Sequence, residues 1–393
     1  MKKFLVLSTI TLAFFTSCSD DNSNQIATTT PVAIDFSDYL NIDFNNLSNY
    51  AFQTTPVYIT KDNTVANPIT NEGATLGRIL FYDENLSSDN TVSCSTCHQQ
   101  VNAFSDIDVA SSGVNGLTGR HSMRLINSRF SNEAKFFWDE RANTLEEQTT
   151  MPIQDHNEMG FSGTNGDGDF NDLIIKLNDV EYYPELFGFA FGDQVITEQR
   201  IQSALAQFIR SIQSFDSKYD VGRTFATNDQ VPFTNFTAEE NTGKQLFLTP
   251  PTFDGSGIRT GGGVGCSGCH AAPEFDIDPN TLNNGIIGVL NSVDTDLTIT
   301  RAPSLRDLFK TDGTLNGGLM HTSISDINSV IEHYNQMPPG SDNAQLDPRL
   351  KPAGNIQNLN MTTDEKSNLI SFLKTLSGTD VYSNEKWADP FVN

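Results

Sequence analysis

Two runs of the form Cys-x-x-Cys-His stand far apart in the chain, at residues 94–98 and 266–270, and they use four of its five cysteines. Two thiols at this spacing can bond the two vinyl groups of one porphyrin, and the adjacent imidazole then reaches the iron. Paired cysteines can also hold zinc or form a redox dithiol, but neither alternative explains a histidine directly after both pairs. The runs therefore predict two covalently attached c-type haems. The attachment and proximal-ligand residues are Cys94, Cys97 and His98 in the first run and Cys266, Cys269 and His270 in the second.

The N-terminus has the form of an export signal. Two lysines precede an apolar stretch, Phe4 to Phe15, which is too short to span a bilayer. Cys18 follows where a bacterial lipoprotein signal presents the residue that is acylated; an ordinary signal peptide with an incidental cysteine is the alternative. We predict a lipoprotein signal over residues 1–18, a flexible tether and N-terminal extension over residues 19–60, and a periplasmic or cell-envelope location.

The charge of the chain limits its partners. The formal charge is −25, and it becomes −27 when Lys2 and Lys3 leave with the signal. Nucleic acid is not expected as a partner, because phosphate binding needs a basic surface. An acidic surface attracts basic proteins, so small basic cytochromes or copper proteins are the expected partners, although acidity can also serve solubility alone. No later segment is apolar enough to cross a membrane, so the lipid anchor is the only membrane contact predicted.

The sequence around the haem runs repeats. Gly-Arg-Ile-Leu-Phe at residues 77–81 precedes the first run, and Gly-Lys-Gln-Leu-Phe at residues 243–247 precedes the second. A similar return segment follows each run, beginning at Phe104 and at Phe275. The chain therefore looks like two related haem modules.

Apolar periodicity predicts helices around these modules. Apolar residues recur at three- and four-residue steps from about Thr197 to Tyr219, which indicates a long amphipathic helix. Capping-box pairs, Thr237 with Glu240 and Thr362 with Glu365, predict two helix starts, and Gly378 is expected to stop the last helix.

Alternation typical of strands is scarce, so the predicted fold is mainly α, with two cytochrome c-like haem domains and long loops. The predicted boundaries are 61–225 for the N-terminal haem domain, 226–378 for the C-terminal one and 379–393 for a tail.

Several longer motifs carry a family resemblance. They are Leu-Gly-Arg-Ile-Leu-Phe at 76–81, Phe-Trp-Asp-Glu-Arg-Ala at 137–142, Leu-Glu-Glu-Gln at 145–148, Pro-Ile-Gln at 152–154, Glu-Met-Gly at 158–160 and Ala-Pro-Ser-Leu-Arg at 302–306. With these motifs, the chain between Asn71 and Gly378 resembles the bacterial dihaem cytochrome c peroxidase family, which includes the methylamine dehydrogenase maturation enzyme. The resemblance implies that the N-terminal haem reacts with peroxide and that the C-terminal haem accepts electrons from a donor and relays them.

Reducing hydrogen peroxide to water requires two electrons, two protons, an open iron and a side chain that moves a proton between the peroxide oxygens. Gln148, Pro152 and Glu158 match the family's distal-pocket residues in identity and spacing. The resemblance thus implies Glu158 as general acid and base and Gln148 as the residue that orients peroxide; a solvated surface acid is the alternative for Glu158. Trp138 matches a residue that lies between the haems and assists electron transfer, a role compatible with that of a core aromatic.

The chain departs from the family pattern at two positions. Family peroxidases often carry a Gly-His-Gly loop whose histidine blocks the peroxide-reacting iron, but Ser112, Gly113 and Val114 stand there in this chain. The first haem is therefore expected to be open even when fully oxidised. His121 stands where family members often place an asparagine that helps to bind calcium, which puts a calcium site in doubt.

The second haem needs a sixth ligand, and three residues downstream of His270 are candidates. Tyr334 best matches the position where peroxidases have a methionine and the maturation enzyme has a tyrosine; Met320 and Met337 are the alternatives. A thioether favours reduced iron, whereas a phenolate favours oxidised iron. We prefer Tyr334.

The resulting expectation is a dihaem peroxidase that reduces hydrogen peroxide with electrons from a small redox protein. A maturation-type oxidase, which uses peroxide to modify a partner protein, and a non-catalytic electron carrier are the alternatives. The resemblance also implies a homodimer.

Overall fold

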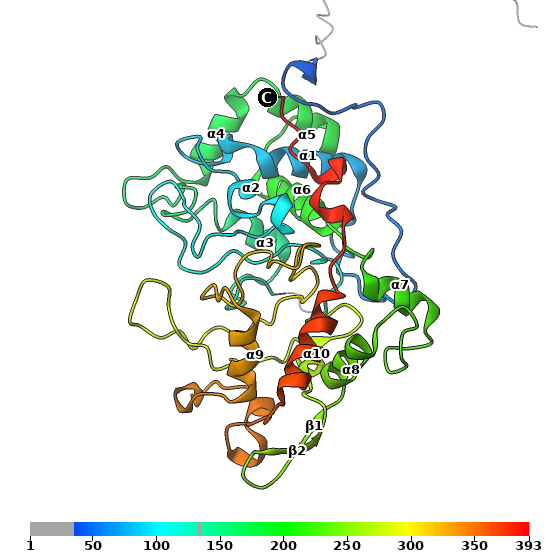
Figure 1. The fold of residues 1–393 in the computed structure, drawn as a ribbon. Coiled ribbons are helices and arrows are strands. Elements are labelled where there is room, and N and C mark those ends of the chain that lie inside the picture. Colours follow the sequence, from blue (N-terminus) through cyan, green and yellow to red (C-terminus); the bar gives the residue numbers. More distant parts are fainter. Residues whose placement is uncertain (1–34, 133–134, 393) are drawn as a thin grey trace, which may run out of the picture. The chain divides into compact units, whose positions relative to one another are not determined.

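The computed structural model describes residues 35–132 and 135–392, and the predicted signal and Cys18 therefore lie outside the described residues. The described part is mainly helical, as predicted, with long connecting loops (Figure 1). None of its helices is long and apolar enough to cross a membrane. The α-helices are α1 (Asn71–Tyr82), α2 (Cys94–Cys97), α3 (Leu145–Thr150), α4 (Phe170–Asp179), α5 (Tyr183–Phe191), α6 (Glu198–Ser211), α7 (Lys218–Phe225), α8 (Ala238–Leu248), α9 (Ile327–Asn335) and α10 (Thr363–Lys374).

Two short antiparallel pairs supply the strands of the described residues. β1 (Pro251–Phe253) pairs with β2 (Arg259–Gly262), with an irregularity between Thr252 and Phe253. β3 (His270–Ala271) pairs with β4 (Asp276–Ile277) directly after the second haem run. Each pair is a two-stranded sheet within the loops of the second half.

Helices α1 and α6 cross at a glycine and bury their apolar faces against each other. Thr70 starts α1 by accepting a hydrogen bond from the backbone N–H of Gly73 at 2.9 Å. A β-carbon on Gly77 would lie 1.9 Å from the carbonyl oxygen of Ala204 in α6, so glycine alone permits this approach. Around the crossing, Leu80 and Phe208 are fully buried. This pair forms the centre of the first core.

Helices α8 and α10 repeat that arrangement in the second core, and Figure 1 shows them as a separate group from α1 and α6. A β-carbon on Gly243 would lie 1.9 Å from the carbonyl oxygen of Asn368. Both predicted capping boxes are confirmed, with Thr237 starting α8 and Thr362 starting α10. α10 ends at Lys374, before Gly378, whose N–H donates to the Asp307 carboxylate at 2.8 Å.

The prediction of one helix from Thr197 to Tyr219 is wrong in its second half. α6 ends at Ser211, and the chain then runs extended until α7 begins after Ser217. Asn127 is the reason, because its backbone N–H donates to Ile212 O at 2.9 Å and its side chain exchanges hydrogen bonds with the backbone of Ser214. These contacts from a distant loop replace the helical hydrogen bonds that the apolar periodicity favoured.

The first core contains residues from both ends of the described part of the chain. Leu40 and Tyr50, from the region predicted as tether and extension, are buried in the first core, and Phe36 begins the compact unit to which the described residues belong. Val381 and Trp387, from the predicted tail, are buried in the first core as well, and Figure 1 shows the C-terminal segment returning from α10 to α1.

Candidate active site

The first haem run is held by a short helix and a reversed turn. α2 contains both cysteines, and Ser93 and Thr96 form a capping box at its start. Phe104, in a left-handed backbone conformation with φ 58°, turns its carbonyl oxygen toward His98, whose Nδ1 lies 3.1 Å away. A hydrogen bond at Nδ1 leaves Nε2 of His98 free to bind a metal. Burial lowers the pKa of His98, so its imidazole is neutral, as an iron ligand must be.

Cys94, Cys97 and His98 share one cavity with Gln148, Pro152 and Glu158. We call this the first cavity; its volume is about 70 Å³. Its other walls are apolar or small, and they come from α1, α3, α6 and the loops between these helices. The structure thus brings the predicted distal residues together with the first haem run. The wall residues include Phe81, Val92, Leu125, Leu205 and Ile209.

Glu158 has the electrostatics of a proton-transfer group. Burial raises its pKa to about 7; the nearby Asp155 carboxylate adds to the rise, and Arg141 opposes it. A pKa near 7 lets the same carboxyl group accept and return a proton at neutral pH. His156, by contrast, pairs its Nδ1 with Asp167 at 2.8 Å and is partly exposed.

The loop from Ser112 to Leu117 is fastened to the segment that carries Glu158. Val114 N–H donates to Glu158 O at 2.9 Å, and Asn115 N–H donates to Asn157 O at 3.3 Å. Gly113 lines the first cavity, and a β-carbon there would lie 2.1 Å from Asn157 O. Gly113, to which the resemblance assigns the position of the family's blocking histidine, therefore has no room for a side chain.

The second haem run lines a much larger cavity of about 540 Å³, which we call the second cavity. This volume lies within the range of cofactor sites. Nδ1 of His270 lies 3.0 Å from Pro303 O, which again leaves Nε2 free. Burial lowers the pKa of His270 to about 4, so this imidazole is neutral as well.

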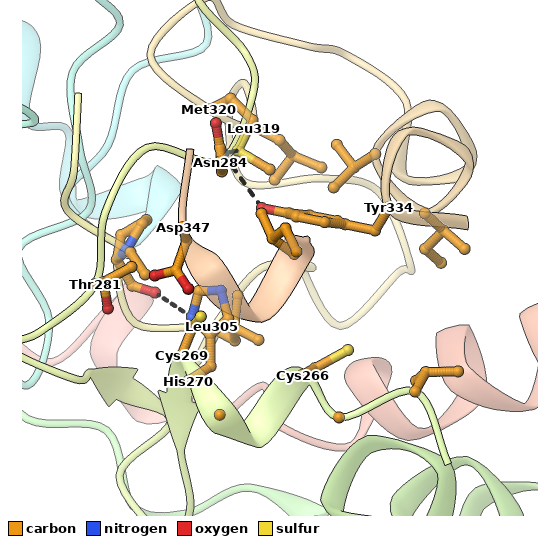
Figure 2. Close-up of a pocket in the computed structure, with 18 of the residues that line it drawn as sticks. Cys266, Cys269, His270, Thr281, Asn284, Leu305, Leu319, Met320, Tyr334 and Asp347 are labelled. Carbon is orange, nitrogen blue, oxygen red and sulfur yellow. Dashed lines mark hydrogen bonds between the residues drawn. The ribbon is translucent and has the colours of Figure 1, made fainter. Parts of the chain in front are cut away.

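Two of the three candidate sixth ligands line the second cavity together. Figure 2 shows Tyr334, from α9, pointing its hydroxyl group toward Asn284 and Met320. The Asn284 side-chain amide donates to the Tyr334 hydroxyl at 3.2 Å and lies 3.3 Å from the Met320 sulfur. Met320 has a left-handed backbone with φ 61°, which is uncommon outside glycine and asparagine. Met337 packs beside Gly285 and does not line this cavity.

Trp138 lines the second cavity near the wall that the two cavities share. Its indole N–H donates to His121 O at 2.8 Å, and the next residue, Ser122, lines both cavities. The ring of His321 lies 6.1 Å from the indole, and Thr300 N–H donates to Trp138 O at 3.0 Å. Trp138 is 7% exposed, so it belongs to the interior of the protein. His121 is itself buried, with Nδ1 2.9 Å from Asp108 O.

Comparison with known proteins identifies the family. The sequence model of the family described as di-haem cytochrome c peroxidase matches residues 71–228. The methylamine utilization protein MauG of Methylophilus methylotrophus is 31% identical over 325 residues, which are 80% of this chain and 85% of that protein. This chain belongs to the di-haem cytochrome c peroxidase and MauG family.

Other members of the family agree in sequence and in fold. The cytochrome c551 peroxidase of Nitrosomonas europaea is 26% identical over 321 residues, covering 78% of this chain and 80% of that protein. The crystal structure of a MauG-like protein associated with microbial copper homeostasis superposes with a TM-score of 0.63, at 26% identity, over 86% of this chain and 98% of that chain. The predicted family and mainly helical fold are confirmed, and membership implies c-type haems at the two cysteine pairs.

The residues of this family member fit such haems by their chemistry. Arg124 lines the second cavity; its Nη2 donates to Ser304 O at 3.2 Å, and its buried Nε has no hydrogen-bond partner among the described residues. Burial lowers the pKa of Arg124 to about 10, so the guanidinium is still charged at neutral pH. A buried cation facing a cofactor cavity suits a carboxylate, and a haem carries two propionates. At the first cavity the fit rests on the two thiols and the neutral His98.

Sequence reasoning missed Asn284 and Arg124. Neither residue belongs to a haem run or to a motif quoted for the resemblance, and only the folded chain brings them to the second cavity. Asn284 contacts both candidate ligands, and Arg124 supplies a guanidinium group whose Nε has no hydrogen-bond partner among the described residues. In the sequence, Arg124 is only a basic residue beside apolar ones, and that pattern does not by itself predict a binding site.

Proposed function

We propose that this protein is a peroxidase that reduces hydrogen peroxide to water with electrons from a small redox protein. In this proposal, the region predicted as 61–225 reacts with peroxide and the region predicted as 226–378 receives the electrons. The observation that carries the proposal is the first cavity, which the half-buried Glu158 carboxyl group, with a pKa of about 7, lines together with the first haem run. The relationship to a cytochrome c551 peroxidase supports the same activity.

In this reaction, Glu158 would transfer the proton and Gln148 would orient the peroxide. A haem held by Cys94, Cys97 and His98 would supply the iron chemistry of the peroxide reaction. The Glu158 carboxylate would accept a proton from peroxide in the first cavity and return it to the departing oxygen, which leaves as water. Gln148 orients the peroxide through its side-chain amide, and the ring of Pro152 closes one wall against solvent. The apolar walls exclude water, which strengthens these hydrogen bonds.

Trp138 would relay electrons between the two haems. Its indole lines the second cavity and donates to the backbone next to Ser122, which lines both cavities. An indole loses an electron more readily than an aliphatic side chain does, so this position shortens each electron-transfer step. His270 and Tyr334 would hold the iron of the second haem, with Met320 as the alternative to Tyr334.

The first haem would be open without prior reduction. Gly113 stands at the cavity wall where a blocking histidine would be needed, and its loop is fastened to the Glu158 segment. We expect a high-spin signal in the electron paramagnetic resonance spectrum of the fully oxidised protein. Two low-spin haems with no high-spin signal would contradict this proposal.

The electron donor would be a small basic cytochrome c or copper protein in the periplasm. The formal charge of −25 supports this class, because complementary charge accelerates encounter. The lipid anchor at Cys18 would keep the enzyme at a membrane facing that compartment.

A maturation-type oxidase is the second candidate function, and the position of Tyr334 favours it. A phenolate at the second haem stabilises oxidised iron and so favours a state in which both haems hold oxidising equivalents. The relationship to MauG supports this alternative. Rapid oxidation of reduced basic cytochrome c by peroxide would support the peroxidase; peroxide consumption without donor oxidation would support the oxidase. A protein with no peroxide reaction would be an electron carrier.

The decisive variant is Glu158→Gln. We expect kcat/KM for peroxide to fall by roughly 10²–10⁴, the usual contribution of a general acid or base. The spectra of both haems should be unchanged. The matched control is Glu147→Gln, because Glu147 is exposed and lies close in sequence. A Glu158→Gln enzyme as active as the control would overturn the proposed role.

A further inference from the structure

Three tyrosines form a continuous series in the first core. The rings of Tyr183 and Tyr182 lie 4.9 Å apart between centroids, and those of Tyr182 and Tyr39 lie 5.2 Å apart. Tyr183 is fully buried and Tyr182 is 6% exposed, whereas Tyr39 is half-buried with its hydroxyl group at the surface. The series therefore runs from the interior to solvent.

Every hydroxyl group in the series donates to a carboxylate. Tyr183 and Tyr182 both donate to Oδ2 of Asp83, each at 2.7 Å. Tyr39 donates to Oε2 of Glu181 at 3.0 Å. Oxidation of a tyrosine requires that its phenolic proton leave, because the radical cation is a very strong acid. A carboxylate already bonded to the hydroxyl group can take that proton without motion of the chain.

The inner end of the series lies beside the first haem run. Tyr183 starts α5, which packs on α1, and α1 supplies Phe81 to the wall of the first cavity. Cys94 packs against the core cluster that contains Tyr183, and α2, which carries Cys94, contacts α1. Asp83 follows directly on the end of α1.

We propose that Tyr183, Tyr182 and Tyr39 carry oxidising equivalents from the first haem site to the surface, where Tyr39 oxidises small phenolic reductants. This activity rests on the proposed reaction with peroxide and adds a second outlet to the route through Trp138. It would operate when the protein donor is absent, and it would protect the first cavity from the oxidant made there.

Electrons and protons balance at each step. Tyr183 gives one electron to the peroxide-oxidised site and its proton to Asp83. Tyr182 then reduces Tyr183, which regains the proton from Asp83, and Asp83 accepts the proton of Tyr182. Tyr39 reduces Tyr182 in the same way, and its own proton moves to Glu181. A phenol in solution finally gives one electron to Tyr39, which recovers its proton from Glu181 while the phenol releases its proton to water. Two phenols are consumed for each peroxide.

Tyr82 provides a matched control. It also lies against the first core, with its ring 5.3 Å from that of Phe81, but its hydroxyl group donates to the backbone carbonyl of Trp387 at 2.7 Å. A carbonyl oxygen is too weak a base to take a phenolic proton. Tyr82 therefore shares the environment of the series and lacks the proton acceptor.

The test measures guaiacol oxidation by the holoenzyme with hydrogen peroxide, for the wild type and for Tyr39→Phe, Tyr183→Phe and Tyr82→Phe. We expect Tyr39→Phe and Tyr183→Phe to lose most of the guaiacol activity and Tyr82→Phe to keep it. Frozen samples taken after peroxide addition without donor should show a tyrosyl radical in the electron paramagnetic resonance spectrum of the wild type, and a nitroso spin trap should label Tyr39. Oxidation of reduced cytochrome c should be unchanged in Tyr39→Phe, which alters a surface hydroxyl group and so leaves the fold intact.

The outcomes separate this inference from the proposed function. If the haem spectrum of the wild type does not respond to peroxide, both fail. If the haem responds and cytochrome c is oxidised, but guaiacol oxidation and the radical are the same in Tyr39→Phe as in the wild type, the tyrosine route is wrong and the peroxidase proposal stands.

Discussion

Gly77 and Gly243 occupy the same position in the two halves of the molecule, and the cavities beside them differ. Each glycine lets its helix approach a partner helix so closely that a β-carbon would lie 1.9 Å from a backbone oxygen. Each half then presents a Cys-x-x-Cys-His run with a neutral histidine whose Nδ1 is hydrogen-bonded to a backbone carbonyl. The scaffold of a haem site is thus repeated.

The residues on the opposite side of each cavity are not repeated. The first cavity has Glu158, which can transfer a proton, and Gln148, which can orient peroxide. Among the described residues that line it there is one thioether, Met159, and no phenol. The second cavity has Tyr334 and Met320, which both contact Asn284. Either of these two side chains could occupy the sixth coordination position of an iron. The carbonyl group that is hydrogen-bonded to Nδ1 of the histidine differs as well. His98 bonds to the nearby Phe104, and His270 bonds to Pro303, 33 residues away. One scaffold thus permits two roles, and the residues on the opposite side of each cavity decide which role it takes.

Removing one haem at a time is the strongest test of the different roles assigned to the two sites. Replacing Cys94 and Cys97 by Ala should abolish the peroxide reaction. Replacing Cys266 and Cys269 by Ala should abolish donor oxidation while peroxide still reacts at the first site. Mass spectrometry should show one haem fewer in each variant. Loss of the peroxide reaction only in the second variant would reverse the assignment of the two sites.

The pH dependence of the peroxide reaction sharpens the role of the first cavity. The Glu158 carboxyl group must be ionised to accept a proton, and its pKa is raised to about 7. Below pH 7, kcat/KM for peroxide should therefore fall about tenfold for each unit of pH, and above it the rate should level off. Stopped-flow measurements give the profile, and Glu158→Gln should flatten it. A wild-type profile without a step near pH 7 would argue against this residue.

Variants of the two candidate ligands sharpen the second cavity. Tyr334→Phe should change the absorption and electron paramagnetic resonance spectra of the second haem, because the phenol is lost as a ligand. Its reduction potential should rise, since phenolate favours oxidised iron. Met320→Leu is the control and should leave both spectra unchanged. The opposite result would assign the ligand to Met320.

The smallest expected effect tests the shared scaffold. Gly77→Ala and Gly243→Ala should each lower the free energy of unfolding by about 1–3 kcal/mol, because the added methyl group has no space between the helices. Urea unfolding of the holoprotein measures this. The controls are Gly119→Ala and Gly255→Ala, one in each half, where no atom lies within 4 Å of the added carbon. Equal effects at all four glycines would mean that the crossings are not tightly packed.

Local patterns gave correct predictions where neighbours in sequence determine the outcome. The capping boxes at Thr237 and Thr362 form because each box joins residues three positions apart. The prediction that the helix continues beyond Ser211 is wrong because Asn127, far away in the chain, forms hydrogen bonds with the backbone of Ile212 and Ser214. Apolar periodicity indicates which face is buried, and it contains no information on where a distant side chain interrupts the hydrogen bonds.

The sequence by itself determined the two haem attachment points, the family and the mainly helical fold, because covalent chemistry and capping depend on residues that are neighbours along the chain. Only the tertiary structure decided that Glu158 is buried enough for a pKa of about 7, that Gly113 has no room for a side chain, and that Asn284 contacts both Met320 and Tyr334. Burial, close approach and shared hydrogen bonds join segments that are distant in sequence, so they exist only when the chain has folded.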